Sequence, residues 1–262
     1  MKLREVYERI DALYPKKLSD DYVAQYGGRD NSGILIDPGK EISGAVFSLD
    51  FSMGAIGFAK ERGANLLVTH HPAIFFPVSN MRADDPLGAR LLAAAGKGIG
   101  VISMHLNLDC AAGGIDESLA LAAGAKGGAH ICELLEQGAG YGRIYDVPEQ
   151  AFGDFAEHLK GELRTQRAFL YGDPAEPVRR AASFCGAGVD GSTVRRAREA
   201  GADVLISADI KHNFICDACE AGLKVIQLTH YASENYGFKK IYQHIGERLG
   251  VPCEFWEDAF LL

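Results

Sequence analysis

The strongest constraint on the fold is the regular alternation of short apolar runs with segments of helical periodicity. The runs have the length and composition of buried strands, and the segments between them place apolar residues at helical spacing, as Leu3, Val6 and Ile10 show. The predicted helices cover residues 3–13, 53–63, 86–95, 115–123, 152–163, 192–200, 211–221 and 234–248, and the predicted strands cover residues 34–36, 45–49, 66–68, 99–104, 144–147, 169–171, 181–184, 204–207, 225–228 and 253–256. This alternation predicts an α/β fold with mostly parallel or mixed sheets.

Composition narrows the class of protein further. The 262 residues are 47% hydrophobic and 24% charged, which suits a globular chain of one large or two small domains. The net charge of −8 argues against a general binder of nucleic acid or of an anionic membrane, because both are anions. Six scattered cysteines favour free thiols in a reducing compartment. Without a signal peptide or an uncharged apolar stretch of about 18 residues, we expect a cytoplasmic protein with no membrane span.

Residue types that bind metal ions follow three of the predicted strands directly. His70 and His71 come after strand 66–68 and before Pro72, which holds His71 extended. Because consecutive side chains of an extended segment point to opposite sides, the two histidines cannot easily chelate one ion, but they can each serve one of two neighbouring ions. The alternative is that backbone groups of the loop satisfy both rings.

His105 and Asp109 follow strand 99–104 in the same way, on a loop that leads to the next helix. Aspartate is a hard oxygen ligand that can bridge two divalent ions. The alternative for Asp109 is a turn or a helix cap, positions that this residue type favours. The position of His105 predicts a proton shuttle or an outer partner of the metal ligands.

His230 and Glu234 follow strand 225–228. If the next helix begins early, the two side chains lie on one side of its first turn, which is a usable metal-binding geometry. The alternative is that Glu234 is a first-turn acid favoured by the helix dipole. Since loops at the carboxyl ends of strands form the binding crevice of open α/β sheets, the convergence of three such strand ends predicts a metal site.

Two further features are candidates for contact with a substrate. Asp209, Lys211 and His212 follow strand 204–207 and are predicted to line the same crevice. The alternative is that they lie on the surface at the start of the next helix. A Gly-rich loop, residues 186–192, precedes helix 192–200, and backbone N–H groups at a helix start bind anions. An ordinary turn from strand to helix is the favoured interpretation of this loop.

Taken together, these motifs resemble the GTP cyclohydrolase 1 type 2 family, also called the Nif-three-like proteins. The early turn Asp30-Asn31-Ser32-Gly33 is similar to the family's Asp-Asn-x-Gly motif, and the similarity runs in order from about residue 2 to residue 257. The stretches that carry the resemblance are Asn65–Pro77, Ser103–Glu117 and Asp203–Glu234, and the paired-His-Pro and His-Tyr-Ala-Ser-Glu motifs within them are highly specific together.

The resemblance implies a dinuclear metal centre with the ligands His70, His71, Asp109, His230 and Glu234. Histidine and carboxylate ligands leave the metal open among Zn, Fe, Mn, Co and Ni. The family fold implies two interleaved α/β domains with mixed sheets flanked by helices. Residues 1–124 plus 229–262 would hold the metal site, and residues 125–228 would form the second domain. Members of the family assemble as ring-shaped homohexamers, so we expect the same here.

Two divalent ions close together lower the pKa of a bridging water and polarise the bond that it attacks. We therefore expect a metal-dependent hydrolase. The resemblance implies that the substrate is a nucleotide and that the imidazole ring of GTP is opened with release of formate. Two other classes remain open: a metal-binding regulatory or scaffold protein that turns nothing over, and a metal-dependent phosphoesterase.

Overall fold

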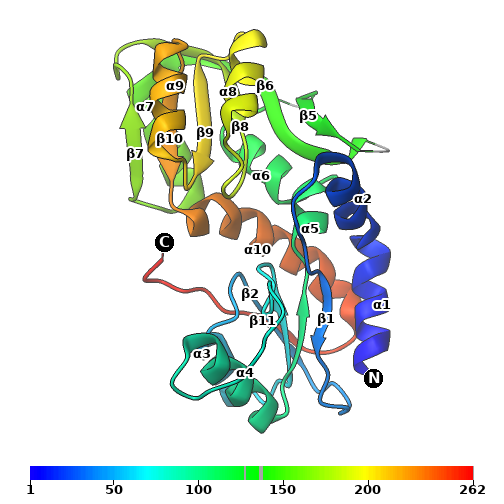
Figure 1. The fold of residues 1–262 in the computed structure, drawn as a ribbon. Helices are drawn as coiled ribbons and strands as arrows, with labels where there is room; N and C mark the ends of the chain where they lie inside the picture. The colour runs from blue at the N-terminus through cyan, green and yellow to red at the C-terminus, as the bar shows by residue number, and fades with distance from the viewer. Residues whose placement is uncertain (127, 136–137, 262) are drawn as a thin grey trace. The chain divides into compact units, whose positions relative to one another are not determined.

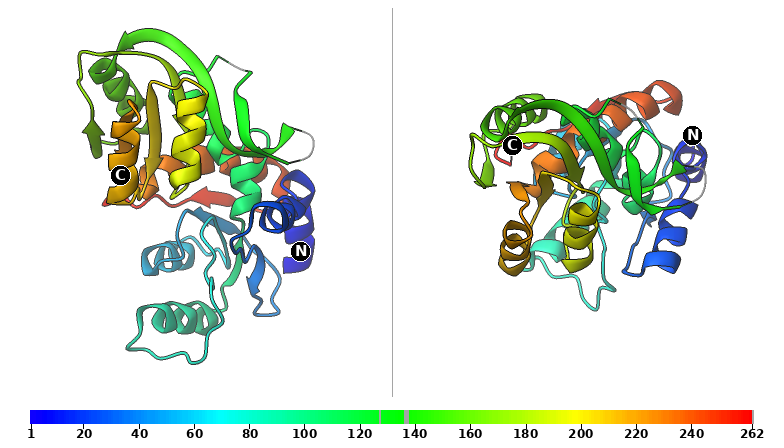
Figure 2. Two further views of the ribbon diagram at one scale, coloured as in Figure 1. Left: turned by 45° about the horizontal axis from the view of Figure 1, so that its top comes forward. Right: turned by 90° about the horizontal axis from the view of Figure 1, so that it is seen from above.

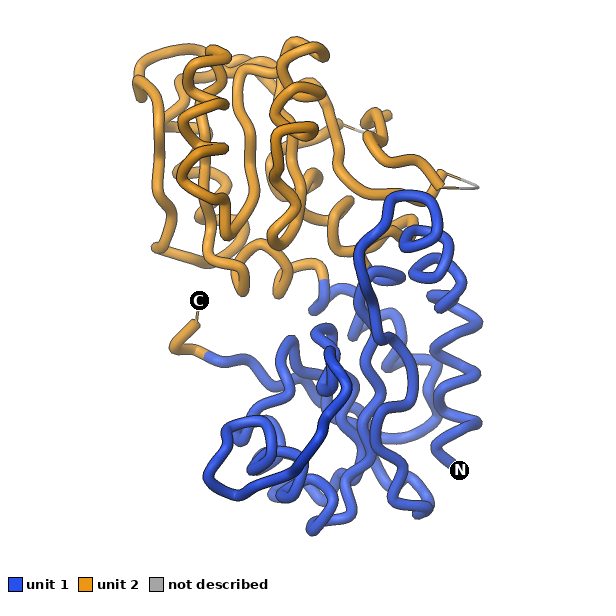
Figure 3. Tube along the Cα trace, in the orientation of Figure 1, with its two compact units in different colours: residues 1–108, 238–258 blue, residues 109–237, 259–262 orange. Residues whose placement is uncertain are grey.

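The computed structural model of the chain describes residues 1–126, 128–135 and 138–261. The chain forms two compact units (Figure 3): unit 1 comprises Met1–Leu108 and Phe238–Asp258, and unit 2 comprises Asp109–Gly237 and Ala259–Leu262. Each unit has its own mixed sheet with helices against it, which confirms the predicted α/β fold with mixed sheets. The predicted domains, 1–124 plus 229–262 and 125–228, stay a prediction.

Unit 1 contains a five-stranded sheet in the order β1-β4-β3-β2-β11. Figure 1 labels three of its strands, β1, β2 and β11. β4, β3, β2 and β11 are parallel, and β1 pairs with β4 in the antiparallel direction. The strands are β1 (Gly33–Ile36), β2 (Ala45–Ser48), β3 (Leu66–Thr69), β4 (Gly100–Ser103) and β11 (Cys253–Phe255). The helices that lie wholly or partly in unit 1 are α1 (Leu3–Leu13), α2 (Lys17–Tyr26), α3 (Met53–Glu61), α4 (Pro86–Lys97), α5 (Leu106–Cys110) and α10 (His230–Leu249).

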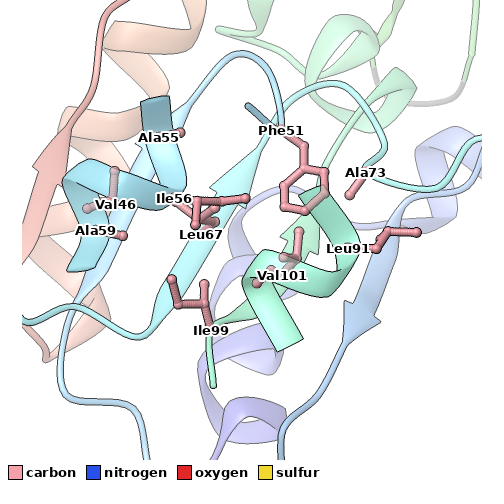
Figure 4. Close-up of a cluster of buried hydrophobic side chains, with 11 residues drawn as sticks. Val46, Phe51, Ala55, Ile56, Ala59, Leu67, Ala73, Leu91, Ile99 and Val101 are labelled. Carbon is pink, nitrogen blue, oxygen red and sulfur yellow. The ribbon is translucent and has the colours of Figure 1, made fainter. Parts of the chain in front are cut away.

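Different helices pack on the two faces of the unit 1 sheet. Val46, Leu67 and Val101 are in register across β2, β3 and β4 and belong to the cluster packed against α3 and α4 (Figure 4). Because side chains alternate along a strand, Phe47 points to the opposite face, where its ring lies 6.2 Å from the ring of Phe238 on α10. Full burial of such a side chain contributes roughly 1.5–3 kcal/mol to stability.

Unit 2 contains a six-stranded sheet in the order β5-β6-β8-β9-β10-β7, in which only β8, β9 and β10 are parallel to one another. α8 and α9 lie side by side on one face, while α6 and α7 contact β6 and β8 from the other (Figure 2). The strands are β5 (His130–Leu134), β6 (Gly140–Ala151), β7 (Ala168–Tyr171), β8 (Pro177–Ser183), β9 (Val204–Ala208) and β10 (Lys224–Leu228). The helices are α6 (Ile115–Ala122), α7 (Phe152–Leu163), α8 (Gly191–Glu199) and α9 (His212–Glu220).

The structure corrects the sequence-based elements at three points that bear on the site. Asp109, expected on a loop, lies on the short helix α5. α10 begins at His230 rather than at residue 234, because Thr229 caps it by accepting a hydrogen bond from the backbone N–H of Ala232. β5 was not predicted at all, since its residues are exposed or half-buried. Within the described chain, no helix combines the length and apolar character that crossing a bilayer requires.

Candidate metal centre

Three histidines lie together in unit 1 at the carboxyl ends of two neighbouring parallel strands. His70 and His71 follow β3, and His105 follows β4. The ring centroid of His70 lies 4.9 Å from that of His71 and 5.0 Å from that of His105. One ring nitrogen from each residue lies within 4.8 Å of the other two, so this cluster can hold a metal ion.

The rings of His70 and His71 are each fixed through the Nδ1 atom. His70 Nδ1 donates to the backbone carbonyl of Met104 over 3.0 Å, and His71 Nδ1 donates to Asp50 Oδ1 over 2.7 Å. Because a carbonyl or carboxylate oxygen can only accept, the proton of each neutral ring lies on Nδ1 and the lone pair on Nε2. Histidines that bind metal ions usually donate their other ring N–H to such a partner.

His105 is held in the same manner by a buried carboxylate. Its Nδ1 lies 2.8 Å from Asp30 Oδ1, and the hydroxyls of Ser19 and Ser32 donate to the other oxygen of Asp30. Burial alone would raise the pKa of Asp30, but the hydrogen bonds from His105, Ser19 and Ser32 outweigh it and hold the pKa well below its usual range. Asp30 is therefore ionised at neutral pH and accepts a hydrogen bond from the His105 ring.

Unit 2 brings Asp109, His230 and Glu234 together. His230 and Glu234 lie one turn apart at the start of α10, with His230 Nε2 3.2 Å from Glu234 Oε1. The carboxylates of Asp109 and Glu234 approach within 4.8 Å, and both residues are buried. The sequence predicted that His230 and Glu234 lie on one side of the first helical turn if the helix begins early. Because α10 begins at His230, this condition is met.

Asp209 fixes the His230 ring from the end of β9. Its Oδ2 atom lies 2.7 Å from His230 Nδ1, so His230 repeats the arrangement of the unit 1 histidines. Asp209 has a φ of +46°, a left-handed conformation that costs a residue other than glycine about 1–2 kcal/mol. Lys211 and His212 lie exposed at the start of α9, where His212 contacts the thiol of Cys216. The role of these three residues in substrate binding stays a prediction.

The Gly-rich loop after β8 packs directly on Glu234. Gly186 has a φ of +58°, and a Cβ atom at this position would lie 2.4 Å from Glu234 Oε1. Its N–H donates to Ser233 Oγ, and its carbonyl accepts from Ser207 Oγ. The loop thus forms a backbone wall behind Glu234.

The far end of the same loop is an ordinary turn from strand to helix. The Asp190 carboxylate caps α8 by accepting hydrogen bonds from the N–H groups of Ser192 and Thr193. Those two N–H groups are therefore engaged by the chain's own carboxylate instead of being aimed at a ligand.

Asp109 is held by a chain of buried groups in unit 2. The Cys185 thiol lies 3.4 Å from Asp109 Oδ1, and burial raises the pKa of this thiol well above its usual value, so it is a neutral donor. The N–H of Cys185 donates to Asp116, which forms a fully buried ion pair with Arg143 at 3.1 Å. Burial raises the pKa of Asp116 to about 7, against the opposing influence of Arg143.

Asp50 was not predicted from the sequence, and Gly186 was predicted only as part of the Gly-rich loop 186–192. Asp50 comes two residues after the end of β2, as His105 does after β4, so the rule that located the histidines would also have found it. The glycines of the loop are visible in the sequence, but the contact of Gly186 with Glu234 is not, because Glu234 lies far away in the sequence.

The comparison with protein families decides the relationship. The model of the family Duf34/NIF3 (NGG1p interacting factor 3) matches residues 1–258. The chain belongs to the DUF34/NIF3 family. This confirms the resemblance found in the sequence motifs.

Relatives in the DUF34/NIF3 family cover nearly the whole chain. A protein of Clostridium perfringens, named GTP cyclohydrolase 1 type 2 homolog, is 29% identical over 258 residues, 97% of this chain and 95% of its own length. A protein of the same name from Methanocaldococcus jannaschii is 28% identical and spans 96% of this chain and 97% of its own length.

Solved structures show the same fold. The Staphylococcus aureus hypothetical protein SA1388 superposes with a TM-score of 0.85 at 24% identity, over 98% of this chain and 97% of that one. Reduced HcgD from Methanocaldococcus jannaschii superposes with a TM-score of 0.79 at 26% identity, over 98% of each chain.

Proposed function

We propose that this member of the DUF34/NIF3 family is a metal-dependent hydrolase. Two divalent ions would be held by His70, His71, Asp109, His230 and Glu234. The observation that carries the proposal is the orientation of the three histidines in this set, each of which is fixed through Nδ1 so that the lone pair lies on Nε2. Imidazole nitrogens and carboxylate oxygens are ligands that suit Zn, Fe, Mn, Co and Ni.

The proposed ligands of unit 2 lie on helices that also carry residues of unit 1. α5 begins directly after His105 and carries Asp109. α10 carries Glu234 in unit 2 and, one turn later on the same helix face, Phe238 in unit 1. The ring of Phe238 lies 6.0 Å from the ring of His70. The proposed ligands of unit 2 therefore lie on the two helices that continue from one unit into the other.

The proposed substrate is GTP, because the relatives with similar sequences are named GTP cyclohydrolase 1 type 2 homologs. When bound, a pair of divalent ions lowers the pKa of water and polarises the bond under attack. His105 would hold or transfer the proton at Nε2, and the ionised Asp30 carboxylate would stabilise the protonated ring.

The metal assignment is tested by metal analysis of the protein purified without chelator. We expect about two divalent ions per chain in the wild type and the loss of bound metal in the double variant His71→Ala, Glu234→Ala, which removes a proposed ligand from each unit. His244→Ala is the matched control, since that ring also bonds through Nδ1, to the Tyr14 hydroxyl, but lies outside the cluster. A wild type without metal, or a double variant with the full load, would refute the assignment.

The activity is tested by incubating the metal-loaded protein with GTP and with a panel of phosphate esters while formate and phosphate are measured. We expect formate release from GTP that is lost in the His71→Ala, Glu234→Ala variant. Phosphate release alone would instead assign a phosphoesterase. A fully loaded protein that turns over none of these compounds would favour the regulatory or scaffold class.

The variant Asp209→Asn tests whether the Asp209 carboxylate orients the His230 ring for metal binding. The amide cannot offer the same charged acceptor to Nδ1–H, so we expect the affinity for the metal to fall about 10–100-fold while the fold is kept. A competition titration against a chromophoric chelator measures this change. Asp217→Asn, which alters an exposed acid on α9, is the control and should match the wild type. Equal affinities in both variants would show that Asp209 does not support a ligand.

Assembly into a ring-shaped homohexamer is also proposed, on the resemblance to the family. Exposed apolar side chains on unit 2 support self-association, with Phe169 68% and Phe260 86% exposed. Light scattering should give a mass of about six times the 28.2 kDa of one chain, and a monomeric mass would exclude the ring.

A further inference from the structure

Two segments of unit 1 that lie far apart in the sequence are joined beside the histidine cluster. Arg29 Nε donates to the carbonyl of Phe75 over 3.1 Å, and Asn31 Nδ2 donates to the carbonyl of Ile74 over 2.5 Å. The first segment contains Asp30, the residue that holds His105, and the second is the loop that follows the paired histidines. The two hydrogen bonds therefore fix both segments relative to His105.

The joined segments place aromatic rings and a cation next to one another. The ring of Phe75 meets the ring of His105 edge to face, with centroids 6.2 Å apart, and Phe76 packs on Phe75 at 5.0 Å. The guanidinium carbon of Arg29 lies 5.1 Å from the centroid of Phe76. Phe76 is 63% exposed, an unusual position for a large apolar ring.

Arg29 differs from an ordinary surface arginine. Arg62 also lies over a phenylalanine, Phe58, at 4.8 Å, but it is paired with the Glu254 carboxylate at 3.4 Å. Arg29 has no carboxylate partner among the residues that the structure describes. Since a guanidinium has five N–H donors and Nε–H is engaged by Phe75, the four Nη–H donors can form the paired hydrogen bonds that an oxyanion accepts.

We propose that Arg29 and Phe76 form a nucleotide-binding subsite beside His105, in which Arg29 binds a phosphate oxyanion and Phe76 stacks against the base. The inference rests on the proposed function, because it names the substrate-recognition residues of the same centre. The aromatic face and the guanidinium select together for a ligand that is both planar and anionic. This combination also explains how a chain with a net charge of −8 can accept an anion locally.

Calorimetric titration of the metal-loaded protein with three probes tests the subsite. GTP offers both the base and the phosphates, guanosine offers the base alone, and inorganic tripolyphosphate offers the anion alone. Arg29→Ala should weaken binding of GTP and of tripolyphosphate by about tenfold or more and leave guanosine unchanged. Phe76→Ala should weaken binding of GTP and of guanosine by about fivefold or more and leave tripolyphosphate unchanged.

Arg62→Ala is the matched control, because it removes the other arginine stacked on a phenylalanine in unit 1, and it should bind all three probes like the wild type. GTP affinity unchanged in both Arg29→Ala and Phe76→Ala would overturn the subsite. A change in the mass of the assembly in these variants would also overturn the subsite, because it would assign Arg29 and Phe76 to an interface between copies of the chain. The metal content of each sample separates this failure from failure of the metal centre, since neither Arg29 nor Phe76 is a proposed ligand.

Discussion

Replacing Arg143 by methionine is expected to lower the free energy of unfolding by about 3–5 kcal/mol. Arg143 and Asp116 form an ion pair whose side chains are 3% and 0% exposed, and Arg143 also donates to the carbonyl of Gly140. Methionine fills much of the space but leaves the Asp116 carboxylate buried without its counter-ion. Denaturant titration measures the change, and the midpoint of thermal unfolding should fall by roughly 6–20 °C.

The penalty in Arg143→Met should depend on pH. Burial raises the pKa of Asp116 to about 7, compared with about 3.9 in an unfolded chain. The folded protein therefore binds this proton more tightly, so the contribution of Asp116 to stability falls as the pH rises from about 4 to about 7. Without Arg143 the pKa of Asp116 rises further. The free energy of unfolding therefore continues to fall above pH 7, by up to about 1.4 kcal/mol per pH unit.

We therefore expect Arg143→Met to be more destabilised at pH 8 than at pH 5. Adding Asp116→Asn to this variant removes the titrating carboxyl and should flatten the extra dependence. A penalty of equal size at both pH values would show that Asp116 does not carry a buried charge.

Gly186→Ala is expected to abolish or severely weaken metal binding while the protein stays folded. A Cβ atom would lie 2.4 Å from Glu234 Oε1, so the carboxylate must move away from the position where it meets His230. Chelator competition measures the affinity, and circular dichroism reports the fold. The added methyl group also meets a backbone φ of +58°, which costs about 1–2 kcal/mol of stability.

Gly201→Ala separates these two effects. Gly201 lies in the same unit with a φ of +70°, but a Cβ atom there would meet nothing within 4 Å. The control should lose a similar amount of stability and keep its metal. Loss of metal in both variants would mean that general destabilisation, and not the displacement of Glu234, is responsible.

Local sequence patterns predict much of the fold because several of its strands, such as β2, β3, β4 and β9, are short and fully buried. α7 was predicted at its observed bounds, residues 152–163, since its apolar side chains follow helical spacing throughout. β6 was predicted only over residues 144–147 of its full length, because its residues from Pro148 on are exposed or half-buried and show no apolar run. α5 has five residues, which is too short to show a helical period.

The part of the candidate site that could be predicted consists of residues that follow the end of a strand. His70, His105 and His230 each come within two residues of the end of a parallel strand, and this relation is visible in the sequence. The hydrogen bonds that orient the rings are not visible, because Asp50 and Asp209 reach the histidines from different strands. The wall behind Glu234 depends on packing within unit 2, which local patterns do not encode.

The insertion of unit 2 between the two parts of unit 1 sets an order of events on the ribosome. β11 pairs with β2, and Phe238 packs on Phe47, yet both partners emerge only after residues 109–237 have been synthesised. Nearly all of unit 2 is continuous in the chain, so its sheet can form first. Until residues 238–258 have been synthesised, the N-terminal part of unit 1 exposes Phe47. We therefore expect chaperones to bind nascent chains that are stalled before this point.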